Sequence, residues 1–340
     1  MNRKLLKVFQ FVFFLLVGLV LLYFAFKDID LNSLTLQIKQ ADYRWVAVSC
    51  FFSLPALLFR AYRWQLLIEP LGTRPKISQV LHAVNIGYLA NFVFPRIGEI
   101  TRCGVLNRTD RIPVDRLFGT VIVERAFDLL ATVIMLCMVL VLQFDIVGDF
   151  IMQNIFYPIV RKIPGAANLK WILIASVLIL LSFILFYRIF KSQLAQIGIL
   201  RKLKDMIKGV FNGIKSIYQI QNFWLFIALN ILIFGMYFMQ TWTMFYALES
   251  TSALSPGDAL FILVITSLSF IIPVQGGIGA YHWIVSTGLT IFGLSREAGM
   301  VYATISHSTT SVILILVGIV SLIAVASRSK IRKTDCHNEP

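Results

Sequence analysis

Charged residues precede a long apolar stretch in this sequence, where they could bind an ion or an anionic group. Glu124-Arg125-x-x-Asp128 is followed by sixteen uncharged residues, 129–144. Side chains four apart share a helix face, and ionisable groups in a membrane span usually face the protein interior and pair with one another. We therefore expect Glu99, Arg102, Glu124, Arg125 and Asp128 to form one buried polar network. The network could be a substrate path, a proton relay or a structural clamp.

Two further stretches read as copies of one another. Residues 91–100, NFVFPRIGEI, align without gaps on residues 269–278, SFIIPVQGGI, and both interrupt apolar segments. Matched Pro/Gly breaks in the two halves of a hydrophobic chain point to a transporter binding site, although Pro and Gly could also merely kink helices. The predicted substrate-binding residues of the two breaks are Asn91, Pro95, Arg96, Gly98, Glu99 and Arg102 in the first, and Pro273, Gln275, Gly276, Gly277, Gly279 and His282 in the second.

The breaks are suited to anion binding. A helix that restarts after Pro and Gly presents free backbone N–H groups, which attract phosphate or carboxylate. Arg96 and Arg102 would add charge there, and a lipid phosphate is the natural ligand; alternatively, both arginines only face headgroups. For Arg60 and Arg63, snorkelling from the end of a span is the favoured interpretation. His282 could couple transport to protons or simply serve as a hydrogen-bond donor.

The composition requires a membrane protein. Hydrophobic residues make up 58% of the chain and charged residues 14%, with a mean hydropathy of +0.80. Each leg of the second interrupted segment, 259–294, is too short to cross, because about 14 residues reach only ~21 Å. In the first, 77–107, residues 77–94 could cross alone, and the distribution of basic residues favours a hairpin instead. We predict an all-α integral membrane protein of about six transmembrane helices plus two oppositely oriented re-entrant helical hairpins in an inverted repeat. The predicted spans are 8–26, 45–66, 117–143, 171–189, 222–248 and 298–327.

The distribution of basic residues predicts the orientation. With these spans, one side of the membrane carries 21 Lys and Arg residues and the other carries four. The positive-inside rule then places both termini in the cytoplasm, in a membrane of the bacterial inner type. We predict a single transmembrane domain, 1–327, whose halves are 1–143 and 170–327, followed by a basic cytoplasmic tail, 328–340. Residues 191–220 have the pattern of an amphipathic helix on the inner leaflet.

Signatures of enzymes are absent from the sequence. It contains no H-E-x-x-H, no G-x-S-x-G and no G-x-x-x-x-G-K-[ST], and its four cysteines lack metal-ligand spacing. We therefore expect no catalytic residues, no metal and no cofactor. The net charge of +14 does not require nucleic acid as a partner, since the topology already accounts for it.

Four motifs in this order resemble the transmembrane flippase-like domain of the lysylphosphatidylglycerol synthase family. They are Arg60-Ala61-Tyr62-Arg63-Trp64, Asn91 to Arg102 with Pro95-Arg96-x-Gly98-Glu99, Glu124-Arg125-x-x-Asp128, and Pro273-x-x-Gly276-Gly277-x-Gly279. The resemblance implies lipid translocation without the soluble synthase domain, so a separate lipid-synthesising enzyme is an expected partner besides membrane lipids. His282 departs from the family pattern, in which relatives often carry a glutamate after the glycine run.

The sequence thus predicts a lipid flippase or transporter of an anionic lipid. Aminoacyl-phosphatidylglycerol, another phospholipid and a polyprenyl-phosphate-linked sugar all carry a suitable phosphate. One alternative is an intramembrane lipid-headgroup transferase, or an accessory subunit of one, with Glu99, Glu124 or Asp128 as general base. A second alternative is a small-solute transporter. The sequence leaves the oligomeric state open.

Overall fold

The structure, a computed structural model, describes residues 3–27, 29–144, 148 and 222–335. The secondary structure of these ranges is helical, without strands. The predicted span 171–189 and the predicted amphipathic helix 191–220 lie outside them. The helices that bear on function are α1 (Arg3–Phe26), α2 (Leu31–Gln40), α3 (Tyr43–Ile68), α4 (Ile77–Val93), α5 (Gly98–Asp110), α6 (Val114–Leu142), α11 (Phe223–Phe245), α12 (Pro256–Ser269), α13 (Ala280–Leu289) and α14 (Arg296–Asp335).

Four of the described helices are long and apolar enough to cross a membrane. They run over Tyr43–Leu71, Val114–Leu142, Phe223–Phe245 and Arg296–Ser327. A fifth crossing results if α1 and α2, which meet at an angle of 87°, are counted together. An all-helical membrane protein is therefore confirmed for the described part of the chain, whereas six spans remain a prediction.

The first interrupted segment folds back on itself. Helix α4 ends at Val93, the chain turns over residues 94–97, and α5 returns along α4. The two helices touch at glycines, since a Cβ atom on Gly98 would lie 2.2 Å from the backbone oxygen of Gly87. The turn includes Arg96 at a φ of 61°, a left-handed conformation that costs a residue with a Cβ energy. A hairpin is therefore formed where the sequence predicts one.

The second interrupted segment has the same organisation. Helix α12 begins with a capping box between Ser255 and Asp258, and α13 packs back against it. Between them, Gly276, Gly277 and Gly279 all have positive φ values, which glycine adopts without steric cost. Gly279 also lets α1 approach, because a Cβ atom there would lie 2.5 Å from the backbone oxygen of Gly18.

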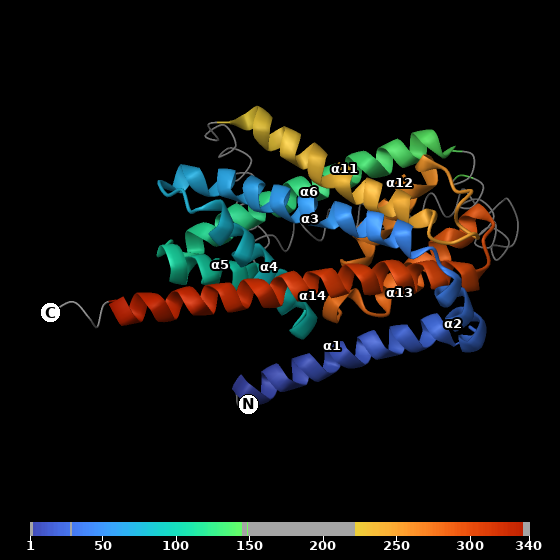
Figure 1. Cartoon of the computed structure of the whole chain (residues 1–340), viewed down its shortest axis with the longest axis horizontal. Coiled ribbons are helices and arrows are strands. Elements are labelled where there is room, and N and C mark those ends of the chain that lie inside the picture. The colour runs from blue at the N-terminus through green and yellow to red at the C-terminus, as the bar shows by residue number, and fades with distance from the viewer. Residues whose placement is uncertain (1–2, 28, 145–147, 149–221, 336–340) are drawn as a thin grey trace, which may run out of the picture.

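Each hairpin packs in its own hydrophobic cluster. Trp64, Val84 and Leu106 belong to the cluster around α4 and α5, and Ile262 and Val285 belong to the cluster around α12 and α13. In Figure 1 the α4–α5 hairpin lies toward the left end of the long axis and the α12–α13 hairpin toward the right, while α14 extends along both. The inverted repeat and the opposed membrane orientation of the hairpins stay predictions.

Helix α2 is an element that we did not predict from the sequence. Its signal is present, because the Asp30 side chain accepts a hydrogen bond from the Asn32 N–H at 2.9 Å and so caps the helix. Leu34 and Ile38 follow at helical spacing and pack into the cluster around the second hairpin. The segment is short and polar on its other face, so it gives no signal of a membrane span.

Candidate functional site

Glu124 is the most deeply buried carboxylate of the predicted network. It lies on α6 between Arg63 of α3 at 3.1 Å and Arg102 of α5 at 2.9 Å, and the Arg63 and Glu124 side chains are completely buried. The Arg102 guanidinium also stacks over the Trp64 ring, 4.4 Å from its centroid, in cation–π geometry. A buried carboxylate needs such partners, because an unpaired charge in the interior is costly. Glu124 thus joins the first hairpin to α3 and α6.

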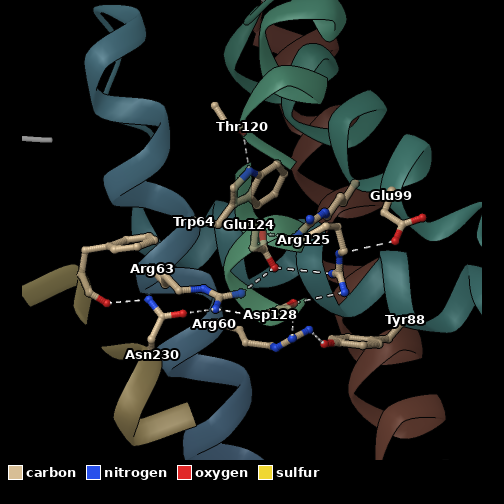
Figure 2. Close-up of polar contacts among 12 residues, drawn as sticks. Arg60, Arg63, Trp64, Tyr88, Glu99, Thr120, Glu124, Arg125, Asp128 and Asn230 are labelled. Atoms are coloured by element: carbon tan, nitrogen blue, oxygen red, sulfur yellow. Dashed lines mark hydrogen bonds and ion pairs between the residues drawn. The ribbon is translucent and has the colours of Figure 1, made fainter. Parts of the chain in front are cut away.

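Asp128 occupies the next position along the same face of α6. One of its oxygens accepts a hydrogen bond from Arg60 at 2.8 Å, and the other accepts one from Arg63 at 2.8 Å. Arg63 also donates to the Asn230 side chain on α11 at 2.6 Å, and Arg60 donates to the Tyr88 hydroxyl on α4. Figure 2 shows these side chains converging from separate helices on the two carboxylates of α6.

Arg125 forms the open edge of the network. It lies 3.3 Å from Asp128 and 3.5 Å from both Glu124 and Glu99, so each contact is longer than the pairs made by Arg60, Arg63 and Arg102. Its side chain is 43% exposed and that of Glu99 is 29% exposed. In Figure 2, Glu99 lies on the far side of Arg125 from Arg63.

The network carries an excess of positive charge. Among the described residues it holds four arginines against three carboxylates, a net charge of +1. Arg102 is 95% buried, yet two of its nitrogens, Nε and Nη2, have no hydrogen-bond partner within the described ranges. Both Glu124 oxygens likewise lack a hydrogen bond within these ranges although they form ion pairs, so it is the net positive charge that favours an anionic ligand at this site.

The first break differs from a simple row of free N–H groups. The Asn91 side chain accepts a hydrogen bond from the Gly98 N–H at 2.8 Å, so the first turn of α5 is already capped in part. Pro95 is buried, whereas Arg96 is exposed and donates to the backbone oxygen of Ile271 at 2.6 Å. The prediction of free backbone N–H groups at this helix end is therefore wrong for the N–H of Gly98.

The second break forms a neutral polar cluster. His307 of α14 hydrogen-bonds the backbone oxygen of Gly276 at 2.9 Å, and its ring lies 4.9 Å from that of His282. His282 Nδ1 is buried without a hydrogen-bond partner in the described part of the chain. Gln275 donates to the backbone oxygen of Phe11 at 3.2 Å and so ties the break to α1. Pro273 directly precedes these residues in the loop after α12.

The two breaks contact each other. One contact is the hydrogen bond from Arg96 to the Ile271 backbone oxygen. The other is the packing of the Phe92 ring on Gly276, since a Cβ atom added to Gly276 would lie only 2.5 Å from that ring. The structure thus divides the predicted site residues into a charged group around α6 and a neutral group around Gly276. Arg96 bridges the hairpins on which these groups lie.

Two sequence interpretations need correction. Arg60 and Arg63 do not snorkel, because they are 8% and 0% exposed and bind the carboxylates of α6. Glu99 and Arg125 belong to the network but are not buried. Sequence reasoning also missed Tyr88 and Asn230, for which the available signal was a polar group in an otherwise apolar span.

The described residues contain no group of three or more His, Cys, Asp or Glu side chains arranged to hold a metal ion. Cys50, Cys103 and Cys137 are free thiols on separate helices. The chemistry that the described site offers is therefore ion pairing and hydrogen bonding.

Fold and site together define a multi-pass helical membrane protein in which a charged, largely buried network joins the first hairpin to α3 and α6. Residues 11–318 match the family described as the lysylphosphatidylglycerol synthase TM region, and the chain belongs to that family. It is also similar to "Glycosyltransferase AglD" of Haloferax volcanii, with 31% identity over 103 residues, or 30% of this chain. The matched part is only 16% of that relative's length. No solved structure matches the chain.

Proposed function

We propose that this protein moves a phosphate-bearing lipid between the leaflets of its membrane. The observation that carries the proposal is the net positive charge of the Arg–carboxylate network, with its open edge at Arg125. An anionic headgroup entering there would neutralise the excess charge. The lipid tails would stay in the bilayer, so only the headgroup has to be carried through a polar path.

The position of the network supports a path rather than a closed clamp. The charged group lies on the first hairpin and its neighbours, and the neutral cluster at Gly276 lies on the second. A headgroup released from Arg125 would need neutral partners next, and the cluster at Gly276 supplies them on the hairpin that Arg96 contacts. Binding that is strong at one end and weak at the other permits release. Family membership adds support, since this domain is named for a lipid-modifying system.

The test is native mass spectrometry of lipids retained by the gently purified protein, before and after incubation with membrane extract. The proposal predicts one selectively retained class of phosphate-bearing lipid, unchanged in mass. The absence of any selective retention would contradict it and favour a small-solute transporter. The proposal also places the protein in a membrane of the bacterial inner type, with both termini in the cytoplasm.

A second candidate function is transfer of a group onto a lipid headgroup. It is favoured by the similarity to a protein named as a glycosyltransferase, although that similarity covers a small part of the relative. Glu99, which is partly exposed, is the carboxylate placed best to act as a general base. A lipid product of increased mass in the same experiment would support this candidate instead.

A further inference from the structure

The ion pair between Arg125 and Glu99 differs from the rest of the network in two ways. Its two side chains are the most exposed members, at 43% and 29%, and its distance of 3.5 Å is as long as any in the network. The pairs behind it are shorter, at 2.8 to 3.1 Å. A partly exposed, long ion pair contributes little to stability and can be exchanged at low cost.

Arg125 can leave its carboxylates without exposing a buried charge. If it moves away, Glu124 keeps Arg63 and Arg102, and Asp128 keeps Arg60 and Arg63. Each buried carboxylate therefore has two other arginine partners. Breaking a buried pair usually carries a large penalty because one charge remains unpaired, and this duplication avoids that penalty.

Glu99 has no such second partner. Arg125 is its ion-pair partner among the described residues, so a ligand that draws Arg125 away leaves Glu99 as a free carboxylate. A ligand that brings only a phosphate would then place its negative charge beside that carboxylate. Like charges side by side repel each other, so such a ligand would bind poorly.

We infer that the Arg125–Glu99 pair opens to bind a zwitterionic lipid headgroup, with Arg125 taking the phosphate and Glu99 taking a primary ammonium group. Arg125 exchanges its three long contacts with carboxylates for the phosphate, and Glu99 gains the ammonium group. Glu124 and Asp128 keep their other arginines, so no charge remains without a partner. Phosphatidylethanolamine and aminoacyl-phosphatidylglycerol headgroups both carry a phosphate and a primary ammonium group, whereas an unmodified phosphatidylglycerol headgroup or a neutral sugar lacks the cation. The inference rests on the proposed function, and it selects a headgroup class among the lipids considered there.

The test uses the full-length protein reconstituted in vesicles of equal parts phosphatidylethanolamine and phosphatidylglycerol, followed by native mass spectrometry of the retained lipids. We expect wild type to retain phosphatidylethanolamine over phosphatidylglycerol by roughly tenfold, the effect of about one charge-assisted hydrogen bond. Glu99→Gln should abolish this preference, and Glu99→Asp should keep it. Arg125→Gln should lower retention of both lipids. The matched control is Arg116→Gln, an exposed arginine near the start of the same helix.

Equal retention of the two lipids by wild type would overturn the inference, and so would a preference that survives in Glu99→Gln. A loss of both lipids in Glu99→Gln, with Glu99→Asp equally affected, would also overturn it, because Glu99 would then act on the site as a whole. Translocation is measured separately in the same vesicles. Selective retention without movement between leaflets would support the headgroup assignment while refuting the proposed function.

Discussion

At the scale of residues, Arg63 is the centre of the site. It is completely buried and contacts Glu124, Asp128 and Asn230, so it links three helices through one guanidinium group. Arginine is suited to this role because its planar fork can donate in several directions at once. Lysine at this position would offer a single point charge and could not reproduce these contacts.

The first prediction concerns Glu124. Glu124→Gln removes the charge that compensates Arg63 and Arg102, so it should lower the free energy of unfolding by about 3 to 5 kcal/mol, the usual cost of breaking a buried pair. Thermal unfolding in detergent measures the effect. Glu249→Gln is the control, since Glu249 is exposed in the loop after α11. Equal melting temperatures for the two variants would contradict the buried ion pairs of Glu124.

The second prediction uses two arginines with the same backbone conformation. Arg96 and Arg111 have φ values of 61° and 57°, and Arg96 also donates to Ile271. Arg111→Gly should stabilise the protein by about 1 kcal/mol, because glycine removes the left-handed strain. Arg96→Gly should gain less, since the contact between the hairpins is lost as well. Chemical denaturation compares the free energies of unfolding of the two variants. An equal increase in both would show that the contact from Arg96 to Ile271 does not contribute to stability.

At the scale of elements, the account depends on two hairpins whose positions are fixed by close backbone approach. The first is tight at Gly87 and Gly98, and the second is tied to α1 at Gly18 and Gly279. A packed core of this kind has no free space, so a single added methyl group either displaces a helix or destabilises the fold. Substitution of these glycines is therefore a sensitive probe of the hairpins.

The third prediction compares two glycines of α5. Gly98→Ala places a Cβ atom against the Gly87 backbone oxygen and the Asn91 side chain, so it should destabilise the protein by roughly 1 to 3 kcal/mol. Gly104→Ala has nothing within 4 Å and should stabilise the same helix by about 0.5 to 1 kcal/mol. Melting temperatures that move in the same direction would argue against the packed hairpin.

Much of the helical architecture could be predicted from the sequence, because the signals are local. The Pro95 and Pro273 breaks mark both hairpins, and the apolar runs mark α3, α6, α11 and α14. The position of Arg60 and Arg63 could not be predicted, since whether an arginine snorkels or pairs depends on helices far away in the sequence. The pairing of His307 with Gly276 likewise depends on how α14 packs on the second break.

The site could likewise be predicted only in part from the sequence. Glu124 and Asp128 share a helix face by their spacing alone, so their common network could be anticipated from α6. That Asn91 caps Gly98, and that Arg125 is exposed while Glu124 is not, follow from the fold of the α4–α5 hairpin. Such details require the three-dimensional arrangement of neighbouring helices.

At the scale of the whole molecule, the fourth prediction concerns topology. Arg108 and Ser250 are both exposed and lie on opposite sides in the predicted topology. In single-cysteine variants, a membrane-impermeant thiol reagent should label Arg108→Cys from the cytoplasm and Ser250→Cys from outside. The background variant replaces the native cysteines with serine: Cys50, Cys103, Cys137 and Cys336. Labelling of Arg108→Cys from outside would contradict the inverted-repeat arrangement.

The central claim, that the Arg–carboxylate network forms a path for a lipid headgroup, is tested most directly by a translocation assay. Purified protein is reconstituted in vesicles with a headgroup-labelled phospholipid, and the labelled lipid that reaches the opposite leaflet is measured over time. We predict that wild type accelerates this movement over protein-free vesicles, leaves the mass of the lipid unchanged, and loses most of the acceleration in Arg125→Gln. Movement at the protein-free rate, or full activity in Arg125→Gln, would contradict the account.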